Sequence, residues 1–388
     1  MSLFKKKWNI VKHQNELVLE NYVTDEIQTI LFPFTIIQSL LLVPKYRIKN
    51  NIITSNDVLL KIVILYGTAI YILVIAYQII HNSDDTVQEV TVTKIQNFHV
   101  YINCIFILTG IIAICLNNIW IQSKFNVMFV LKLQKIFRFF NNVVICMKYV
   151  RRNRFCIITI VILYILFVIY NCLMYPNLPF HVILSSCIII IFDIDMICAI
   201  IFIQLLNDLA IEWCRETVSF IENGKSLKPL FEIYTDLMKT FEMYKNNFQI
   251  LILYYTSKNL FQSLVYVEML IEYYQIPKGS KELHITSTSS AMILLWLFKN
   301  FVLQVLQNLY CDDFYTTIEK CQDICSVILE SDCSEDNKKL CKNVRRLHRA
   351  SFSKMRACQL FDVDVCLLLH LFELLASNSI VLLQFAFL

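Results

Sequence analysis

The chain has 388 residues, of which 57% are hydrophobic and 17% charged, with a net charge of +4 and only four glycines. A soluble domain typically has about 25% charged residues and about 7% glycine, so this is not the composition of an ordinary soluble enzyme. Phosphate-binding loops need several glycines in one short segment, whereas Gly67, Gly110, Gly224 and Gly279 are far apart. The composition therefore excludes nucleotide chemistry on such loops, and the small net charge predicts no nucleic-acid partner.

Seven apolar segments are long enough to cross a membrane, because a helix needs about 20 mainly apolar residues to span the hydrocarbon core. No alternating polar face marks them as barrel strands, so we expect helices. The sequence predicts an all-α polytopic membrane protein with seven transmembrane helices at residues 58–80, 98–120, 155–175, 180–206, 247–275, 286–310 and 363–388.

An eighth apolar segment, residues 27–43, is short, contains Pro33 and has basic clusters on both sides. Crossing would place one cluster outside, against the usual cytoplasmic bias of Lys and Arg, so we expect this segment to lie in the membrane interface. The basic start is followed by polar sequence and does not resemble a cleaved signal peptide. Residues 1–57 are therefore predicted to form a cytoplasmic and interfacial segment.

The positions of lysine and arginine predict the orientation of the chain. Of 35 such residues, 29 lie in residues 1–57, 121–154, 207–246 and 311–362, and three lie in residues 81–97, 176–179 and 276–285. This bias predicts a cytoplasmic amino terminus and, after seven crossings, an extracellular carboxyl terminus, the opposite of a G-protein-coupled receptor. The organisation that follows is helices one to six over residues 58–310, a cytoplasmic helical linker over 311–362, and a last helix over 363–388.

The cytosolic segments are themselves expected to be helical. Apolar residues recur every three or four positions in residues 227–246, which indicates an amphipathic helix. Residues 337–355 are strongly basic, and two interpretations stay open. This segment is either a solvated face beside anionic lipid headgroups or part of a cytoplasmic bundle that joins subunits.

The fifteen cysteines and seven histidines give no metal or cofactor pattern. The cysteines lie in predicted spans or cytoplasmic segments, where thiols stay reduced. The histidines are isolated, without an H-x-x-x-H or H-E-x-x-H pattern. With no nucleophile and base paired in any span either, we expect no cofactor and no enzymatic activity.

The last helix carries a short motif. Its sequence runs Ser377-Asn378-Ser379-Ile380-Val381-Leu382-Leu383-Gln384-Phe385. It resembles the insect gustatory receptors, whose final span carries Thr-Tyr, five hydrophobic residues and then Gln-Phe. Ser377 replaces the threonine and Gln384-Phe385 match at the family spacing, whereas Asn378 replaces the tyrosine and Ser379 is less hydrophobic than the family pattern. The seven spans and the inside amino terminus agree with the same family, and the chain looks like its short, divergent bitter-type members.

The resemblance implies a chemosensory, ligand-gated, non-selective cation channel in the plasma membrane of sensory neurons. It also implies a homo- or heterotetramer that responds to a small organic tastant, with the last helix of each subunit lining the pore. The implied pore and gate residues are Ser377, Ile380, Val381, Gln384 and Phe385, where a glutamine ring and a phenylalanine ring would form polar and apolar constrictions. Alternatively, Gln384 bonds to a helix of its own subunit and Phe385 only packs. A G-protein-coupled type of receptor and a secondary transporter also stay open.

The predicted topology brings the outer halves of spans two to six around a possible ligand pocket. An aromatic wall with a few polar groups suits a small organic ligand, although the same side chains also occur as packing residues and interface anchors. The candidate pocket residues are Tyr101, Asn103, Tyr164, Tyr170, Asn171, Asp193, Asp195, Tyr266, Glu268 and Trp296.

Asp193 and Asp195 are the least expected members of this set, because a carboxylate inside a membrane is costly unless it faces protein or water. They are two residues apart, so one helix cannot present both to the same side. We expect one to pair with Lys258 or Lys299 and the other to face a hydrated pocket, where it would attract a cationic alkaloid. The alternative is that both make structural contacts.

Overall fold

The computed structural model describes residues 21–84, 91–121, 123–174, 180–275 and 282–387, and it is about 85% helical. Two short β-hairpins, β1–β2 and β3–β4, interrupt the helices. The elements follow in the order α2 (Asp25–Leu40), β1 (Arg47–Lys49), β2 (Ile52–Thr54), α3 (Val58–Asp84), α4 (Thr91–Leu116), η2 (Asn117–Ile121), α5 (Ser123–Phe140), α6 (Val143–Met174), α7 (Phe180–Ile188), α8 (Ile190–Glu222), α9 (Lys228–Gln275), α10 (Glu282–Glu330), α11 (Glu335–Ser351), β3 (Arg356–Ala357), β4 (Phe361–Asp362) and α12 (Val365–Phe387).

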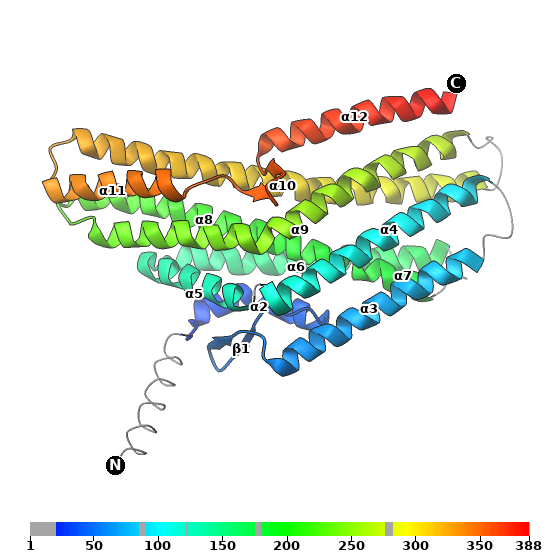
Figure 1. Cartoon of the computed structure of the whole chain (residues 1–388), viewed down its shortest axis with the longest axis horizontal. Helices are drawn as coiled ribbons and strands as arrows, with labels where there is room; N and C mark the ends of the chain where they lie inside the picture. The colour runs from blue at the N-terminus through cyan, green and yellow to red at the C-terminus, as the bar shows by residue number, and fades with distance from the viewer. Residues whose placement is uncertain (1–20, 85–90, 122, 175–179, 276–281, 388) are drawn as a thin grey trace, which may run out of the picture.

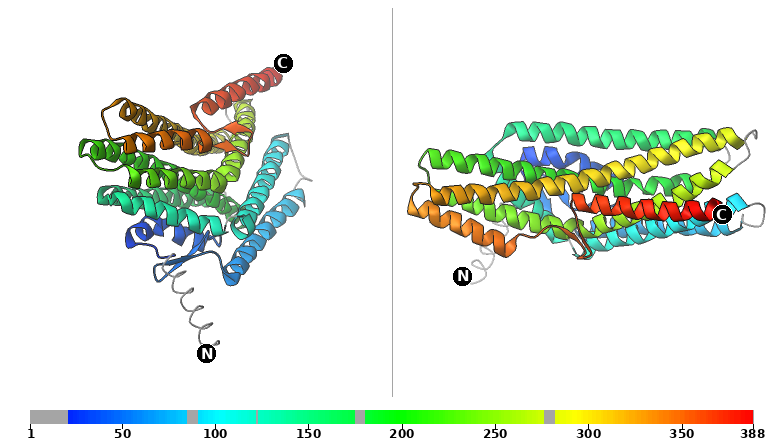
Figure 2. Two further views of the ribbon diagram at one scale, coloured as in Figure 1. Left: turned by 60° about the vertical axis from the view of Figure 1, so that its left-hand side comes forward. Right: turned by 90° about the horizontal axis from the view of Figure 1, so that it is seen from above.

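The helices form an elongated bundle (Figure 1), with most of the long helices inclined to its long axis by modest angles. The carboxyl ends of α3, α9 and α12 lie at one end of the bundle, and α11 lies at the other, beside the turn between α8 and α9. Two further views show that α12 lies along one side of the molecule and that its far end stands apart from the other helices (Figure 2).

Within the described residues, six helices are long and apolar enough to cross a membrane. This confirms a membrane-embedded, all-α polytopic chain. The six segments are Val58–Ile80, Tyr101–Ile119, Val143–Leu173, Ile183–Glu222, Ser290–Glu330 and Val365–Gln384.

The predicted span at residues 247–275 is not one of the six. It forms the carboxyl-terminal part of α9, a helix of 48 residues. Lys258, Asn259 and Gln262 interrupt its apolar sequence, which lowers its hydropathy. Lys258 and Gln262 are buried, at 1% and 2% exposed, so these polar groups face protein.

Three other helix boundaries differ from the sequence prediction. The predicted span at 180–206 is divided into α7 and α8 at Ile189, and the span at 98–120 ends in the π-helical turn η2. The last helix begins at Val365, because the two residues of β4 pair with β3 and Asp364 accepts a hydrogen bond from the backbone N–H of Leu367 at 3.3 Å. That bond satisfies an amide in the first turn of α12.

The predicted interfacial segment forms α2, and Pro33 lies inside the helix. Its apolar residues Ile27, Ile30, Leu31 and Phe34 repeat at helical spacing, and all four are at most 2% exposed. The helix packs mainly against α6 and also touches α8. One face of α2 is therefore part of the protein core.

Around α11, the adjoining parts of α8, α9 and α10 continue the same hydrophobic core, and we call this part the α11 bundle. Its core is aromatic: Trp213 of α8 packs on Tyr234 of α9, and Phe241 of α9 packs on Phe314 of α10, with ring centroids 5.0 and 4.6 Å apart. The indole N–H of Trp213 donates to the carbonyl of Leu230 at 2.8 Å, so the buried ring has no unpaired polar group. The predicted basic segment, residues 337–355, forms α11 over most of its length.

A charged contact fixes α5 on α9. Asp236 of α9 lies 2.9 Å from Nζ of Lys132 and 2.6 Å from Nζ of Lys135, both on α5. Burial raises the pKa of Asp236, but the hydrogen bonds and charges of the two lysines outweigh it, so the pKa of this carboxyl lies below its usual value.

Candidate functional site

The bundle holds an ion pair between α8 and α10, in which the aspartate is fully buried and the lysine side chain is 10% exposed. Asp193 is 0% exposed and its Oδ2 binds Nζ of Lys299. The hydroxyl of Tyr164 donates to the same oxygen at 2.7 Å, and that of Tyr255 lies 3.1 Å from Oδ1. Both carboxylate oxygens are thus occupied by donors from α6, α9 and α10, which is what a charge in this position requires.

The aromatic ring of Trp296 completes this centre. Nζ of Lys299 lies 3.8 Å from the Trp296 ring centroid, within the range of a cation–π contact. Tyr164 and Phe167 of α6 pack on the same indole, at centroid distances of 5.3 and 5.0 Å. The lysine side chain is therefore held between a carboxylate and an aromatic surface.

Side-chain amides extend the contacts from this ion pair across the bundle. Oδ1 of Asn300 lies 3.4 Å from the Tyr255 hydroxyl, and Nδ2 of Asn300 donates to Oε1 of Gln262 at 3.5 Å. Nε2 of Gln262 then donates to Oδ1 of Asn103 on α4 at 2.8 Å. We call the whole set the Asp193 network; it joins five helices through Asn103, Tyr164, Asp193, Tyr255, Gln262, Trp296, Lys299 and Asn300.

A second ammonium group lies beside the network. Lys258 of α9 is 1% exposed, lies 5.5 Å from the ring centroid of Phe192, and interacts electrostatically with Asp193 and Lys299. The network therefore pairs one carboxylate with Lys299, and Lys258 is a second buried lysine beside this pair.

Asp195 faces another side of α8, as expected from its spacing. Its Oδ1 lies 3.0 Å from Nζ of Lys45 and accepts a hydrogen bond from Nε2 of Gln38 at 2.8 Å. A cavity of about 20 Å³ adjoins Asp195 and Lys45, large enough for about one water molecule. Gly110 lines the same cavity, and a Cβ there would lie 2.6 Å from ring atoms of Phe192 and Tyr254.

The structure brings four of the ten predicted pocket residues into one network: Asn103, Tyr164, Asp193 and Trp296. Both aspartates are paired with lysines, and Lys299 is one of the two partners expected for them. Neither carboxylate is therefore available as an unpaired anion for a cationic ligand.

The other predicted pocket residues lie outside the Asp193 network. Tyr266 packs with Val265 and Met269 beside Trp296, and Asn171 donates to the carbonyl of Phe167 one turn earlier in its own helix. The Tyr170 hydroxyl is buried without a hydrogen-bond partner, and Tyr101 and Glu268 are half-buried.

Five important residues were not among the predicted site residues: Gln38, Lys45, Tyr255, Gln262 and Asn300. For α9 a signal was present, because Tyr255, Asn259 and Gln262 repeat at helical spacing within an apolar sequence and so mark one polar face. No such signal existed for Gln38 and Lys45, since their partner lies 157 and 150 positions away in the sequence.

A cavity of about 380 Å³ lies between α6 and α10, and Ile197 of α8 contributes to its wall. This volume is within the range of small-molecule sites. Of the predicted pocket residues only Trp296 lines it, together with Lys299; the remaining lining is almost wholly apolar. We call this cavity the α6–α10 groove.

The predicted pore residues lie on an exposed helix. α12 is anchored near its start, where Leu367 and Leu368 are each 8% exposed and Phe372 packs on Phe301 of α10. Further along, Ile380 and Val381 are 56% and 46% exposed, and Ser377 and Gln384 are exposed as well. The exposure of Gln384 does not match an interhelical bond within one subunit. The side chain of Phe385 lies outside the described residues.

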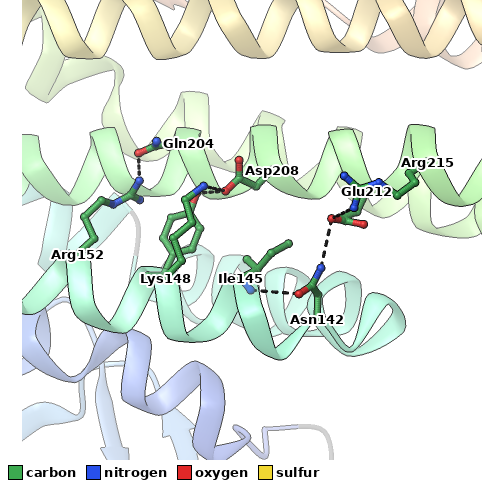
Figure 3. Close-up of polar contacts among 9 residues, drawn as sticks. Asn142, Ile145, Lys148, Arg152, Gln204, Asp208, Glu212 and Arg215 are labelled. Atoms are coloured by element: carbon green, nitrogen blue, oxygen red, sulfur yellow. Dashed lines mark hydrogen bonds and ion pairs between the residues drawn. The ribbon is translucent and has the colours of Figure 1, made fainter.

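Polar contacts join α8 to the first part of α6 and to Asn142, the residue before α6 begins (Figure 3). Asn142 donates to Glu212 at 3.3 Å, Lys148 binds Asp208 at 2.7 Å, and Arg152 binds Gln204. Nε and Nη2 of Arg152 are buried and have no hydrogen-bond partner.

Comparisons with known proteins assign the chain to no family. No model of a known protein family matches the chain, and no curated protein matches its sequence.

Proposed function

We propose that this chain is a subunit of a ligand-gated, non-selective cation channel of the gustatory-receptor type, which opens in response to a small organic tastant. The observation that carries the proposal is α12: an apolar helix, anchored only near its first turns, whose remaining length presents Ser377, Ile380, Val381 and Gln384 outward. A helix with a glutamine and a serine on an exposed surface is well placed to meet equivalent helices of other subunits around water.

Seven crossings belong to this proposal, with α9 as the additional one. Thr256, Lys258 and Gln262 in its membrane part are buried against neighbouring helices, at 3%, 1% and 2% exposed. The carboxyl end of α12 lies at the end of the bundle opposite α11 (Figure 1). Since the segment around α11 holds many of the basic residues, the positive-inside bias favours a cytoplasmic α11 and an extracellular end of α12.

A physical connection between the Asp193 network and α12 supports ligand gating. Asn300, a network member, lines a cavity of about 40 Å³ with Leu368 and Phe372 of α12. Thr256 of α9 and Gln304 of α10 share a hydrogen bond at 3.2 Å and line the same cavity. A shift of α10 at Trp296 or Lys299 would therefore reach the anchored part of α12 through adjacent side chains.

The exposed surface of α12 also supports the proposal of a tetramer. Only 6% of the apolar stretch of α12, a helix of 23 residues, is buried in the single chain. Packing against other copies or related subunits would cover that surface and place the four α12 helices around one axis. The implied location is the plasma membrane of sensory neurons.

The direct test is electrical. The chain is expressed in cells, alone and with co-subunits, and patch-clamp recordings are made during application of plant compounds and sugars. The proposal predicts unitary cation currents that at least one compound evokes. Saturable substrate flux without unitary currents would instead indicate a transporter.

Topology supplies an independent check. Epitope tags are placed before Met1 and after Leu388, and intact cells are compared with permeabilised cells. We expect the carboxyl-terminal tag to be stained on intact cells and the amino-terminal tag only after permeabilisation. The reverse pattern would favour a G-protein-coupled type of receptor and contradict the proposal.

A further inference from the structure

The α6–α10 groove is open toward the surroundings of the bundle. Phe155 of α6 and Phe298 of α10 are 67% and 65% exposed at its rim, and Leu295 is 50% exposed. The backbones of α6 and α10 lie mainly against α8, and side chains of the two helices meet at Trp296, where Tyr164 and Phe167 pack on the indole. In a membrane this groove faces lipid and not water.

The groove has the length of one acyl chain. Its lining runs from Phe155 to Phe167 on α6 and from Met292 to Leu303 on α10. At a rise of 1.5 Å per residue these stretches are about 18 and about 17 Å long. One leaflet contributes about 15 Å to the hydrocarbon core, so the groove accommodates a lipid tail over most of its length.

A basic residue, Arg152, precedes the groove lining on α6; its guanidinium now binds Gln204 of α8 and lies 4.2 Å from the ring centroid of Tyr149. Arg152 precedes Cys156, Thr159, Leu163 and Phe167 on α6 at helical spacing, so it belongs to the same face of the helix as the groove lining. Its unpartnered atoms, Nε and Nη2, form one edge of the guanidinium plane. Such an edge binds two oxygens of a phosphate in bidentate geometry.

The neighbouring charges favour an anion at this position. Lys148, one turn before Arg152, has a side chain that is 51% exposed, and Arg151 is also exposed. The carboxylate on the facing helix, Asp208, is already bound to Lys148 and to the hydroxyl of Tyr149 at 2.9 Å. Glu212 is bound to Arg215 at 2.6 Å. The local balance is therefore positive.

We infer that the α6–α10 groove is a binding site for an anionic phospholipid of the cytoplasmic leaflet. The phosphate binds the Nε–Nη2 edge of Arg152, and one acyl chain lies in the groove with its end against Trp296. Binding requires the guanidinium to turn this edge toward the groove, which gives both nitrogens a partner. The inference rests on the orientation proposed above, in which the start of α6 is cytoplasmic and so faces the leaflet rich in anionic lipid. It does not rest on channel activity.

The end of the acyl chain is where the lipid site meets the Asp193 network. Trp296 and Lys299 line the groove and also hold Asp193 through the cation–π contact and the ion pair. A lipid tail packed on Trp296 excludes water from the lysine and fixes the indole. Loss of the lipid would leave this side of the network less constrained.

Photolabelling of the full chain tests the site. The purified protein is reconstituted in phosphatidylcholine vesicles containing phosphatidylserine with a diazirine near the end of one acyl chain, irradiated, digested and analysed by mass spectrometry. We expect labels concentrated on groove residues such as Leu163 and Leu295. Labels spread evenly over exposed residues of α3, α6 and α12 would overturn the proposal.

Matched variants separate the tail site from the head site. Thr159→Trp and Leu163→Trp fill the groove and should each abolish the concentrated labelling, whereas Ile158→Trp, on an exposed face of α6, should leave it unchanged. Two filling variants are used so that one misfolded protein does not decide the result. Labelling that persists in both overturns the tail site.

For the head site, Arg152→Gln should reduce labelling by phosphatidylserine about fivefold, the effect expected for one basic group at a membrane surface. Arg154→Gln changes an exposed arginine on another face of the same helix and should leave labelling close to wild type. Equal labelling of the wild-type chain by a phosphatidylcholine probe, or no loss in Arg152→Gln, overturns the assignment of an anionic lipid. Since no current is measured, a failure here differs from a failure of the channel proposal.

Discussion

Replacing Asp193 by asparagine should destabilise the bundle more than any change to one of its lysine partners. Asp193 is 0% exposed, and its carboxylate pairs with Nζ of Lys299. Asp193→Asn therefore leaves the ammonium group of Lys299 without its counter-ion, beside a second buried lysine, Lys258. Removing one partner of a buried ion pair costs about 3–5 kcal/mol.

Lys299→Met should cost less, because the remaining carboxylate keeps Lys258 nearby and accepts from the hydroxyls of Tyr164 and Tyr255. A hydrogen bond to a charged group contributes about 1.5–3 kcal/mol, so these donors limit the loss. Asp336→Asn is the control: Asp336 and Lys339 form an exposed i,i+3 pair on α11, and such pairs contribute at most about 1 kcal/mol.

The assay is the free energy of unfolding in mixed detergent micelles, measured by titration with a denaturing detergent and followed by circular dichroism. We expect the order of destabilisation to be Asp193→Asn, then Lys299→Met, then Asp336→Asn. A loss below about 1 kcal/mol for Asp193→Asn, or a larger loss for Lys299→Met, would contradict the assignment of Asp193 as the buried counter-ion of Lys299.

Three further predictions concern the α11 bundle and its neighbours. Because the pKa of Asp236 is lowered in the folded state, its ion pairs stabilise the fold fully above the unfolded pKa of about 3.9, and this contribution is lost as pH falls through the folded pKa. In a pH series below about pH 5, the free energy of unfolding of Asp236→Asn should therefore fall less steeply than that of the wild type. Sγ of Cys214 lies 3.0 Å from Sγ of Cys321, so hydrogen peroxide should oxidise the two thiols to one disulfide and be reduced to two water molecules. Peptide mapping should find this disulfide in the wild type and should not find it in Cys214→Ser. Trp213→Ala should cost about 3–5 kcal/mol, because it empties a buried site and removes the indole hydrogen bond to the Leu230 carbonyl; a loss below about 1 kcal/mol would be inconsistent with the observed burial.

Hydropathy predicted the membrane-embedded helices well where a helix is apolar on all sides. α3 and α6 are examples, since both carry long stretches without acidic residues and both are largely exposed in the single chain. α9 is different because it supplies Tyr255, Lys258 and Gln262 to the interior. The polar residues that give α9 its role are the same ones that reduce its hydropathy.

The candidate site was only partly predictable for a related reason. The sequence indicated that Asp193 and Asp195 face different sides of one helix and that a lysine in the spans would pair with one of them, and Lys299 does so. Whether Lys45 would reach Asp195 depended on α2 packing into the core. Pairs far apart in the sequence leave no local pattern, so tertiary packing alone brings them together.

Boundaries at the ends of helices were the other point that local pattern did not determine. The predicted last span begins at residue 363, yet Phe361 and Asp362 form β4, which pairs with β3, and α12 begins only at Val365. The backbone of Phe361 and Asp362 pairs with that of Ala357 and Arg356 in β3. An apolar sequence thus predicts burial in membrane or protein but not the residue at which a helix starts.

The central claim, that α12 lines a cation pore, is tested most directly by single-channel conductance after charge is placed at Gln384. Purified wild-type, Gln384→Glu and Gln384→Lys proteins are reconstituted in planar bilayers under identical salt and activating ligand. We predict a larger unitary cation conductance for Gln384→Glu and a smaller one for Gln384→Lys, because a ring of charge concentrates or repels cations in the pore. Unitary cation currents of equal size in all three proteins would contradict it.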